Sequence, residues 1–280
     1  MTRRTFLLLA CSLLALPALV GCSTNPVTGR RELILISREQ EIALGAEAAP
    51  KFEQEFGGRV PNDQLQGYVR SVGARLAAAS DRPMPYSYTI LKSDVPNAFA
   101  LPGGSIFITA GLMRRMTNER QLAAVLGHET AHVAAMHSVQ QMQKQMGAQL
   151  LVEIVGRIGG PDKGQTAADV AKIASTMALL RYSREDEYQA DVVGIRYATR
   201  AGYNPWGMVE LLNVLKSLSD SEPGTFSEMF QTHPMSSKRI REAEAILKDD
   251  AYAKWSPTQR DARERNFMRM RALLPDAVKK

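Results

Sequence analysis

The chain has 280 residues, of which 45% are hydrophobic and 23% are charged, and its formal net charge is +6. This composition is typical of a folded globular protein with one large domain or two small ones. The positive charge is spread thinly, with no long run of Lys or Arg, and therefore argues against a protein that binds nucleic acid.

The first 21 residues have the pattern of an export signal. Arg3 and Arg4 precede an apolar run over residues 6–20, which is too short for a comfortable membrane span. The run ends in the letters LVGC, which resemble the lipobox of bacterial lipoproteins. This resemblance implies cleavage before Cys22 and attachment of enough acyl chains for stable anchoring. The alternative is an ordinary signal peptide or an uncleaved anchor with an incidental cysteine, and both Sec and Tat export stay open.

The residues after Cys22 bear on the location of the protein. Ser23 follows the cysteine and favours the outer membrane, so we expect a lipid anchor on its periplasmic face. Residues 22–31 are polar and rich in turn formers, which predicts a lipidated tether. Cys11 would be removed with the signal, so the mature chain would contain no disulfide bond. We expect the folded domain to cover residues 32–255.

The first half of this domain shows alternating helix and strand patterns. The apolar run over residues 32–37 predicts a strand or an extended arm. Amphipathic patterns predict helices over Glu39–Phe56 and Asn62–Ala79, the first kinked or ended by Pro50. The alternating, β-rich stretch Tyr86–Lys92 predicts a strand.

Residues 97–109 predict a hairpin, because a Pro-Gly-Gly turn joins two short β-prone runs. An extended peptide can pair with an exposed sheet edge beside a binding site. We therefore assign a candidate substrate edge strand to Gly104, Ser105, Ile106 and Phe107. An ordinary structural hairpin is the alternative.

The stretch Gln121–His137 reads QLAAVLGHETAHVAAMH and contains the H-E-x-x-H pattern. Its apolar flanks without proline predict a buried helix, on which His128 and His132 share one face. Both imidazoles could then bind one metal ion. Glu129 lies about 100° around the helix, where it could take a proton from water. The alternative is a pair of hydrogen-bonded core histidines.

Three residues compete to complete the metal site. His137 lies about 140° around the helix from His132, off its face, and reads as a polar helix residue. Glu153 is out of register within an apolar run. Glu187 and Asp191 lie one turn apart in the helical region over residues 166–199. The first could bind the metal and the second could hold a ligand histidine, unless they belong to a charged helix face.

Two other segments leave alternatives open. Residues 140–164 are rich in Met and Leu and then in Gly, and could form a lid, a membrane-touching flap or core packing. The C-terminal tail over residues 256–280 is basic and helical in pattern, and we expect it to be solvated or to form a partner surface.

A combination of motifs resembles one family of zinc metallopeptidases. The motifs are H-E-x-x-H, E-x-x-x-D on a later helix, and Thr232-His233-Pro234 with Arg239. This family includes the CAAX prenyl proteases, the HtpX membrane peptidases and the periplasmic peptidases BepA and LoiP. The chain has no membrane helix after the signal and no C-terminal repeat, so it looks most like the compact LoiP type.

The resemblance implies a fold and an activity. The fold is α+β and mainly α-helical, a gluzincin-type domain with a small sheet beside the metal helix. One Zn²⁺ per chain would be held by His128, His132 and Glu187, with Glu129 as the base and Asp191 behind a ligand. The activity would be endopeptidase cleavage of unfolded or misassembled envelope proteins. The alternative is a non-proteolytic zinc-fold lipoprotein that acts as a chaperone or as an assembly scaffold with envelope partners.

His233 has three possible roles. It could donate a hydrogen bond to the oxyanion, as could Tyr182, or it could bind the metal as a fourth ligand and close the site. As a third possibility, it is a structural residue of its loop.

Overall fold

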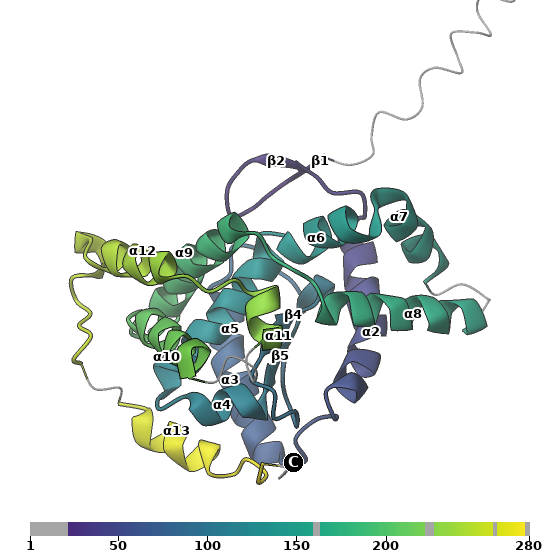
Figure 1. Ribbon diagram of the computed structural model, residues 1–280. Helices are drawn as coiled ribbons and strands as arrows, with labels where there is room; N and C mark the ends of the chain where they lie inside the picture. Colours follow the sequence, from purple (N-terminus) through teal and green to yellow (C-terminus); the bar gives the residue numbers. More distant parts are fainter. Residues whose placement is uncertain (1–21, 159–162, 222–226, 260–261, 278–280) are drawn as a thin grey trace, which may run out of the picture.

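The buried helix α5 (Glu119–Ala134) packs against one face of helix α9 (Arg184–Arg200) (Figure 1). The protein's structure, a computed structural model, describes residues 22–158, 163–221, 227–259 and 262–277. Gly127 and Gly194 let the two helices approach closely, because a Cβ on Gly194 would lie 3.0 Å from the His128 backbone nitrogen. This crossing brings the H-E-x-x-H residues of α5 to the start of α9.

The remaining elements follow in chain order. The strands are β1 (Cys22–Thr24), β2 (Arg31–Leu33), β3 (Ser87–Leu91), β4 (Ala98–Ala100) and β5 (Ser105–Thr109). The other helices are α2 (Arg38–Glu55), α3 (Asp63–Ala78), α4 (Ala110–Arg115), α6 (His137–Met146), α7 (Ala148–Arg157), α8 (Lys163–Ala178), α10 (Gly207–Ser221), α11 (Ser227–Thr232), α12 (Ser237–Leu247) and α13 (Glu264–Arg271). The predicted class, mainly helical with a small sheet, is confirmed.

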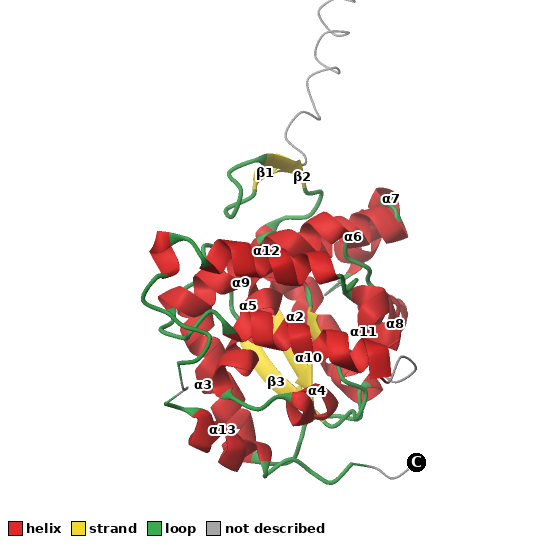
Figure 2. Ribbon diagram, turned by 60° about the vertical axis from the view of Figure 1, so that its left-hand side comes forward, coloured by secondary structure: helices red, strands yellow, loops and turns green. Residues whose placement is uncertain are grey.

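The three-stranded sheet has the order β3-β5-β4, with β3 parallel and β4 antiparallel to β5. Its strands are yellow in Figure 2 and are covered by helices. The predicted strand and hairpin are confirmed. The assignment of an edge strand is wrong, because Ser105, Ile106 and Phe107 lie in central strand β5, and Gly104 lies in the turn before it. Both sides of β5 are already paired, so no substrate can add to it. The edge strand of the hairpin is β4.

The buried hydrophobic residues form two clusters. One is formed mainly by α3, α5, α9, α10 and the sheet, and the other by α2, α6, α7 and α8 with β4. Helices α6 and α7 bury Val139, Met142, Leu151 and Ile154 in the second cluster. Of the three alternatives for residues 140–164, these buried side chains support core packing for the described part.

Helix α2 begins at a capping box on Ser37 and continues through Pro50 to Glu55, so the prediction that Pro50 could end it is wrong. The proline costs one backbone hydrogen bond, but Ala48 and Phe52 on either side are buried and hold the helix.

The segment predicted as a tether is folded onto the domain. Strands β1 and β2 pair in antiparallel register, at the top of Figure 1, with Cys22 opposite Leu33. The amide of buried Asn25 donates to the Ala135 carbonyl oxygen at 3.1 Å and to Glu32 at 3.0 Å. An open tether over residues 22–31 is therefore wrong, although its lipidation stays a prediction. The predicted signal over residues 1–21 lies outside the described residues.

The described part of the C-terminal tail also packs on the domain. Helix α13 lies beside α3 in both views and buries Phe267 and Met270 (Figures 1 and 2). Arg271 donates to the Met116 carbonyl oxygen at 2.6 Å. The expectation of a solvated tail is wrong for these residues. None of the described helices is long and apolar enough to cross a membrane.

Candidate metal centre

The H-E-x-x-H residues lie on a helix that is buried along its whole length. Helix α5 begins where the Asn118 side chain accepts from the Gln121 backbone N–H, and it contains no proline. The Nε2 atoms of His128 and His132 lie 3.0 Å apart. This distance means that the two ring nitrogens meet at one point, as the helical spacing predicts.

Helix α9 brings a carboxylate to the same point. Its capping box on Ser183 starts the helix so that Glu187 lies in the first turn, fully buried. One oxygen of Glu187 is 3.4 Å from the His132 Nε2, and the other is 3.6 Å from the His128 Nε2. The structure thus brings together the three residues predicted to bind metal.

His233 is the fourth member of the cluster. It follows α11, and its backbone N–H donates to the Met229 carbonyl oxygen at 2.7 Å. Its Nδ1 lies 2.9 Å from a Glu187 oxygen. Ligand atoms of His128, His132, Glu187 and His233 all lie within 4.8 Å of one another, and within the described ranges this is the one such cluster of at least three.

The charges of the cluster suit a metal cation. Burial lowers the pKa of His132 well below its ordinary value, so the imidazole is neutral and offers a lone pair. Burial alone would raise the pKa of Glu187, but the charge of Arg239 is the largest of the influences that lower it, and this group stays a carboxylate. Neutral imidazoles with one carboxylate are the donor set of catalytic zinc sites.

A carboxylate and an arginine lie behind His128. Its Nδ1 is 3.0 Å from Asp191, one turn along α9 from Glu187, as predicted. Arg239 on α12 binds both oxygens of Asp191 at 2.7 Å and one oxygen of Glu187 at 2.5 Å. Burial would raise the pKa of Asp191, but Arg239 and then His128 lower it, so it stays ionised.

His137 lies behind His132, where the sequence did not place it. Helix α5 ends at Ala134, and Met136 has a left-handed backbone (φ 60°), alone among the described residues other than glycine. The chain turns there, so the Nδ1 of His137 is 2.9 Å from the Nδ1 of His132. The prediction that His137 faces away is wrong, because its angle of about 140° assumed one continuous helix.

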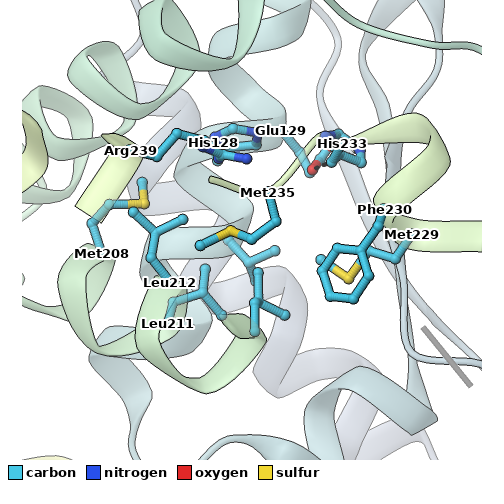
Figure 3. Close-up of a pocket in the computed structure, with 12 residues that line it drawn as sticks. His128, Glu129, Met208, Leu211, Leu212, Met229, Phe230, His233, Met235 and Arg239 are labelled. Atoms are coloured by element: carbon cyan, nitrogen blue, oxygen red, sulfur yellow. Dashed lines mark ion pairs between the residues drawn. The ribbon is translucent and has the colours of Figure 1, made fainter. Parts of the chain in front are cut away.

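A small pocket gives access to the cluster (Figure 3). Its empty space, counted together with the open solvent at its mouth, is about 380 Å³. Polar side chains form one wall, namely those of His128, Glu129, His233 and Arg239. Apolar side chains form the rest, namely those of Val125, Met208, Leu211, Leu212, Leu215, Met229, Phe230 and Met235. In this pocket wall, the buried Oε2 of Glu129 has no hydrogen-bond partner.

The comparisons with known proteins agree with this geometry. The model of peptidase family M48 matches residues 63–247, which is more than half of the chain. The chain belongs to peptidase family M48.

Relatives of this M48 chain have names that refer to proteases. The chain is 29% identical to the beta-barrel assembly-enhancing protease of Escherichia coli K12 over 236 residues, which are 80% of the chain and 47% of that protein. It is 28% identical to the Yersinia pestis protein of the same name, over 84% of the chain and 51% of the relative. It is also 29% identical to the mitochondrial metalloendopeptidase OMA1 of Schizosaccharomyces pombe, over 79% of the chain and 65% of that protein. The chain therefore spans about half the length of its bacterial relatives.

Two other sequence candidates lie away from the centre of the M48 cluster. Glu153 is exposed on α7 and pairs with Arg157 at 2.5 Å. The Tyr182 ring stacks on His132 with centroids 3.8 Å apart, but its hydroxyl is 3.0 Å from the Ser138 hydroxyl. Tyr182 thus packs a ligand histidine instead of pointing its hydroxyl at the cluster.

The sequence reasoning missed Gln189 of the M48 site altogether. Its side-chain oxygen is 2.7 Å from the Nε2 of His137. Gln189 lies two residues after Glu187 on α9 and carries no charge, so no pattern in the sequence marks it. Its role depends entirely on the unexpected position of His137.

Proposed function

We propose that this chain is a zinc-dependent metalloendopeptidase of the bacterial cell envelope. The observation that carries the proposal is the buried cluster of His128, His132 and Glu187 beside Glu129, whose Oε2 has no hydrogen-bond partner. An unpaired buried carboxylate oxygen is costly, and a base that must contact water and substrate is one reason to keep it.

The metal would be held by His128, His132 and Glu187. Zinc bound by this donor set would polarise a water molecule and the substrate carbonyl, which makes both more reactive. Asp191 and Arg239 would keep the ligands in place from behind. The donor set favours zinc over harder cations, which prefer sites made of oxygen ligands.

Glu129 would act as the general base and then as the general acid. Burial raises its pKa, and the cations nearby lower it only in part. A carboxylate with a raised pKa takes a proton from the attacking water more readily and can return it to the leaving amine. No other carboxylate lines the described wall of this pocket.

The surroundings of the cluster suit an extended polypeptide. The apolar wall of the pocket in Figure 3 would accept an apolar side chain next to the scissile bond. Residues Phe99, Ala100 and Leu101 line a second small pocket that also contains His233. A substrate strand would therefore pair with edge strand β4, not with β5.

His233 would close the enzyme at rest. Its contact with Glu187 at 2.9 Å, and its place among four converging ligand atoms, support a fourth metal ligand over an oxyanion donor. Two contacts hold its loop in this position: Tyr182 N–H donates to the Thr232 carbonyl oxygen at 3.0 Å, and Arg239 donates to that of Pro234 at 3.3 Å. A four-ligand site leaves no position for chemistry until the loop moves.

The latch is tested with His233→Ala. Loss of a latch raises basal cleavage of casein, whereas loss of an oxyanion donor slows it by about 10²–10³-fold. Cleavage at the wild-type rate with unchanged zinc affinity would contradict both roles and leave His233 a structural residue.

The envelope location rests on the sequence around Cys22 and on the bacterial relatives, whose name refers to beta-barrel assembly. The substrates of the enzyme would be unfolded or misassembled envelope proteins, and an assembly factor would be its partner. Cys22→Ala should prevent incorporation of radiolabelled palmitate. Label that still enters this variant would contradict the lipid anchor.

The endopeptidase is tested with Glu129→Gln. This variant should keep about one zinc per chain, because its ligands are intact, and should lose casein cleavage. Thr130→Val on the same helix changes a residue that faces Tyr88 and should keep both. Casein cleavage by purified Glu129→Gln at the wild-type rate would overturn the proposal. A wild-type protein that binds zinc but does not cleave casein would favour a chaperone or scaffold.

A further inference from the structure

Three buried or half-buried side chains form a continuous hydrogen-bonded row behind the metal cluster. The Nδ1 of His132 is 2.9 Å from the Nδ1 of His137, and the Nε2 of His137 is 2.7 Å from the Oε1 of Gln189. His132 and His137 are 0% and 2% exposed, so water does not replace these contacts. The row therefore links a residue of α9 to a ring nitrogen at the cluster.

The hydrogen-bonding capacity of Gln189 determines where the protons of the row lie. An amide oxygen only accepts, so the Nε2 of His137 carries the proton of this contact, and in the neutral ring its Nδ1 then offers a lone pair. The Nδ1 of His132 must then donate, which leaves its Nε2 free of a proton. That free lone pair is the one that meets the Nε2 of His128 and Glu187.

The opposite orientation of Gln189 would reverse each of these roles. Its amide N–H would donate to His137, His137 would donate to His132, and the proton of His132 would move to Nε2. A neighbouring charge argues against this arrangement. Asp186 lies 3.8 Å from the Nε2 of His137 and itself accepts from Gln141 at 2.6 Å, so negative charge favours a proton on that Nε2.

We propose that His137 and Gln189 are positioning residues that hold His132 in the Nδ1–H tautomer, with its Nε2 lone pair directed at the metal. The proposal rests on the proposed function only in taking His132 as a metal ligand. Neither residue touches the pocket of Figure 3, so neither acts on the substrate. The left-handed turn at Met136 is the backbone feature that brings His137 into this position.

The tautomers are tested directly by NMR. The chain has four histidines, so the ring nitrogens of the ¹⁵N-histidine-labelled, zinc-loaded full chain give a spectrum that can be assigned. The Glu129→Gln background prevents self-cleavage. We expect a proton on Nδ1 of His132 and on Nε2 of His137. A proton on the Nδ1 of His137, which would point at the Nδ1–H of His132, would overturn the proposal.

Zinc affinity, measured by competition with a chromogenic chelator, is the second test. His137→Phe keeps a ring but removes both nitrogens, and it should weaken zinc binding by about 10–100-fold. His137→Gln keeps an acceptor for His132 and should recover most of this loss. Gln189→Leu removes only the distal acceptor and should give a smaller loss in the same direction.

A matched control separates positioning from general damage. Tyr88→Phe removes a buried hydrogen bond to Thr130, on a part of α5 that does not face the row. It should leave zinc affinity unchanged. Wild-type affinity in folded His137→Phe would overturn the proposal, and if that variant fails to fold, Gln189→Leu and the tautomers decide. All measurements use an inactive background, so absence of peptidase activity would not affect their outcome.

Discussion

His128 and His132 present the same atom to the same point, but their rear nitrogens meet different chemistry. Behind His128 lies the carboxylate of Asp191, which is bound by Arg239. Behind His132 lies the imidazole of His137, followed by the uncharged amide of Gln189. Both groups behind His128 are charged, whereas the two side chains behind His132 are uncharged, and the carboxylate of Asp186 lies farther off, 3.8 Å from the His137 Nε2.

Groups that contact the rear nitrogen of a ligand histidine can act in two ways, and the two histidines differ in which of them applies. A carboxylate behind a ligand histidine makes the ring more basic as well as orienting it. A neutral imidazole orients the ring and selects its tautomer but adds no charge. Damage on the charged side should therefore change both the stability of the fold and metal binding, and damage on the neutral side should change mainly metal binding.

The largest effect on zinc binding and activity is expected at Glu187, which contacts both His128 and His132. Glu187→Gln removes the carboxylate that contacts both histidines, so the chain should lose stoichiometric zinc and casein cleavage. Glu153→Gln changes an exposed glutamate on α7 and should keep both. Metal analysis that finds full zinc in Glu187→Gln and altered zinc in Glu153→Gln would show that the third ligand is wrongly assigned.

The next effect tests the charged side through stability. Arg239→Leu leaves two buried carboxylates without their cation and should lower the free energy of unfolding of the metal-free protein by about 3–5 kcal/mol. Lys238→Leu, next to it on α12, breaks only an exposed pair with Glu242 and should cost less than about 1 kcal/mol. Urea unfolding of both variants measures the difference. Equal losses would mean that the charges behind His128 do not stabilise the fold.

The third effect compares the two sides in zinc affinity. Asp191→Asn should weaken zinc binding by about 10–100-fold, because it removes the carboxylate charge that lies 3.0 Å from the Nδ1 of His128. Gln189→Leu should weaken zinc binding less, because it removes a neutral acceptor that reaches His132 only through two successive hydrogen bonds. Chelator competition on both variants, in one buffer, gives the ratio. A greater loss in Gln189→Leu would reverse the comparison.

The smallest effect concerns charges of α9 that lie away from the cluster. Asp81 pairs with Arg196 and Arg200, which lower its pKa below 3.8 although partial burial alone would raise it. Because the folded pKa is the lower one, these pairs stabilise the fold above about pH 4, and the gain is lost as the pH falls through the folded pKa.

Asp81→Asn should therefore lower the free energy of unfolding by less than about 1 kcal/mol at pH 7, and the difference from wild type should vanish in strong acid. Asp220→Asn, in an exposed and loose pair, is the control and should show no difference at either pH. If Asp81→Asn lowered the free energy of unfolding at pH 7 as much as Arg239→Leu does, the partly exposed ion pairs of Asp81 would stabilise the fold as strongly as the buried pairs of Arg239.

Local rules were sufficient where the relevant neighbours lie within one helix. The spacing of His128 and His132 predicted a shared face, and that of Glu187 and Asp191 predicted a ligand with a supporting carboxylate one turn on. The structure places all four residues as this periodicity requires. The strand at residues 87–91 and the hairpin around Pro102 are local in the same sense and were also predicted.

Local rules failed where a partner comes from elsewhere in the chain. The edge-strand assignment was wrong because β3 pairs with the second side of β5, which no feature of residues 104–107 reveals. Residues 22–31 and α13 have polar, exposed-looking sequences, but Asn25 and Phe267 are buried on the domain. Pairing and docking of this kind depend on surfaces that exist only after the chain has folded.

The sequence by itself determined the metal-facing residues, because helical periodicity repeats every few residues and needs no tertiary contact. Only the tertiary structure decided what stands behind them. A single left-handed residue, Met136, ends α5 and turns His137 back onto His132, and the crossing of α5 with α9 places Gln189 within reach. A left-handed backbone at a non-glycine residue costs about 1–2 kcal/mol and is maintained only by surrounding packing, so no local pattern predicts it.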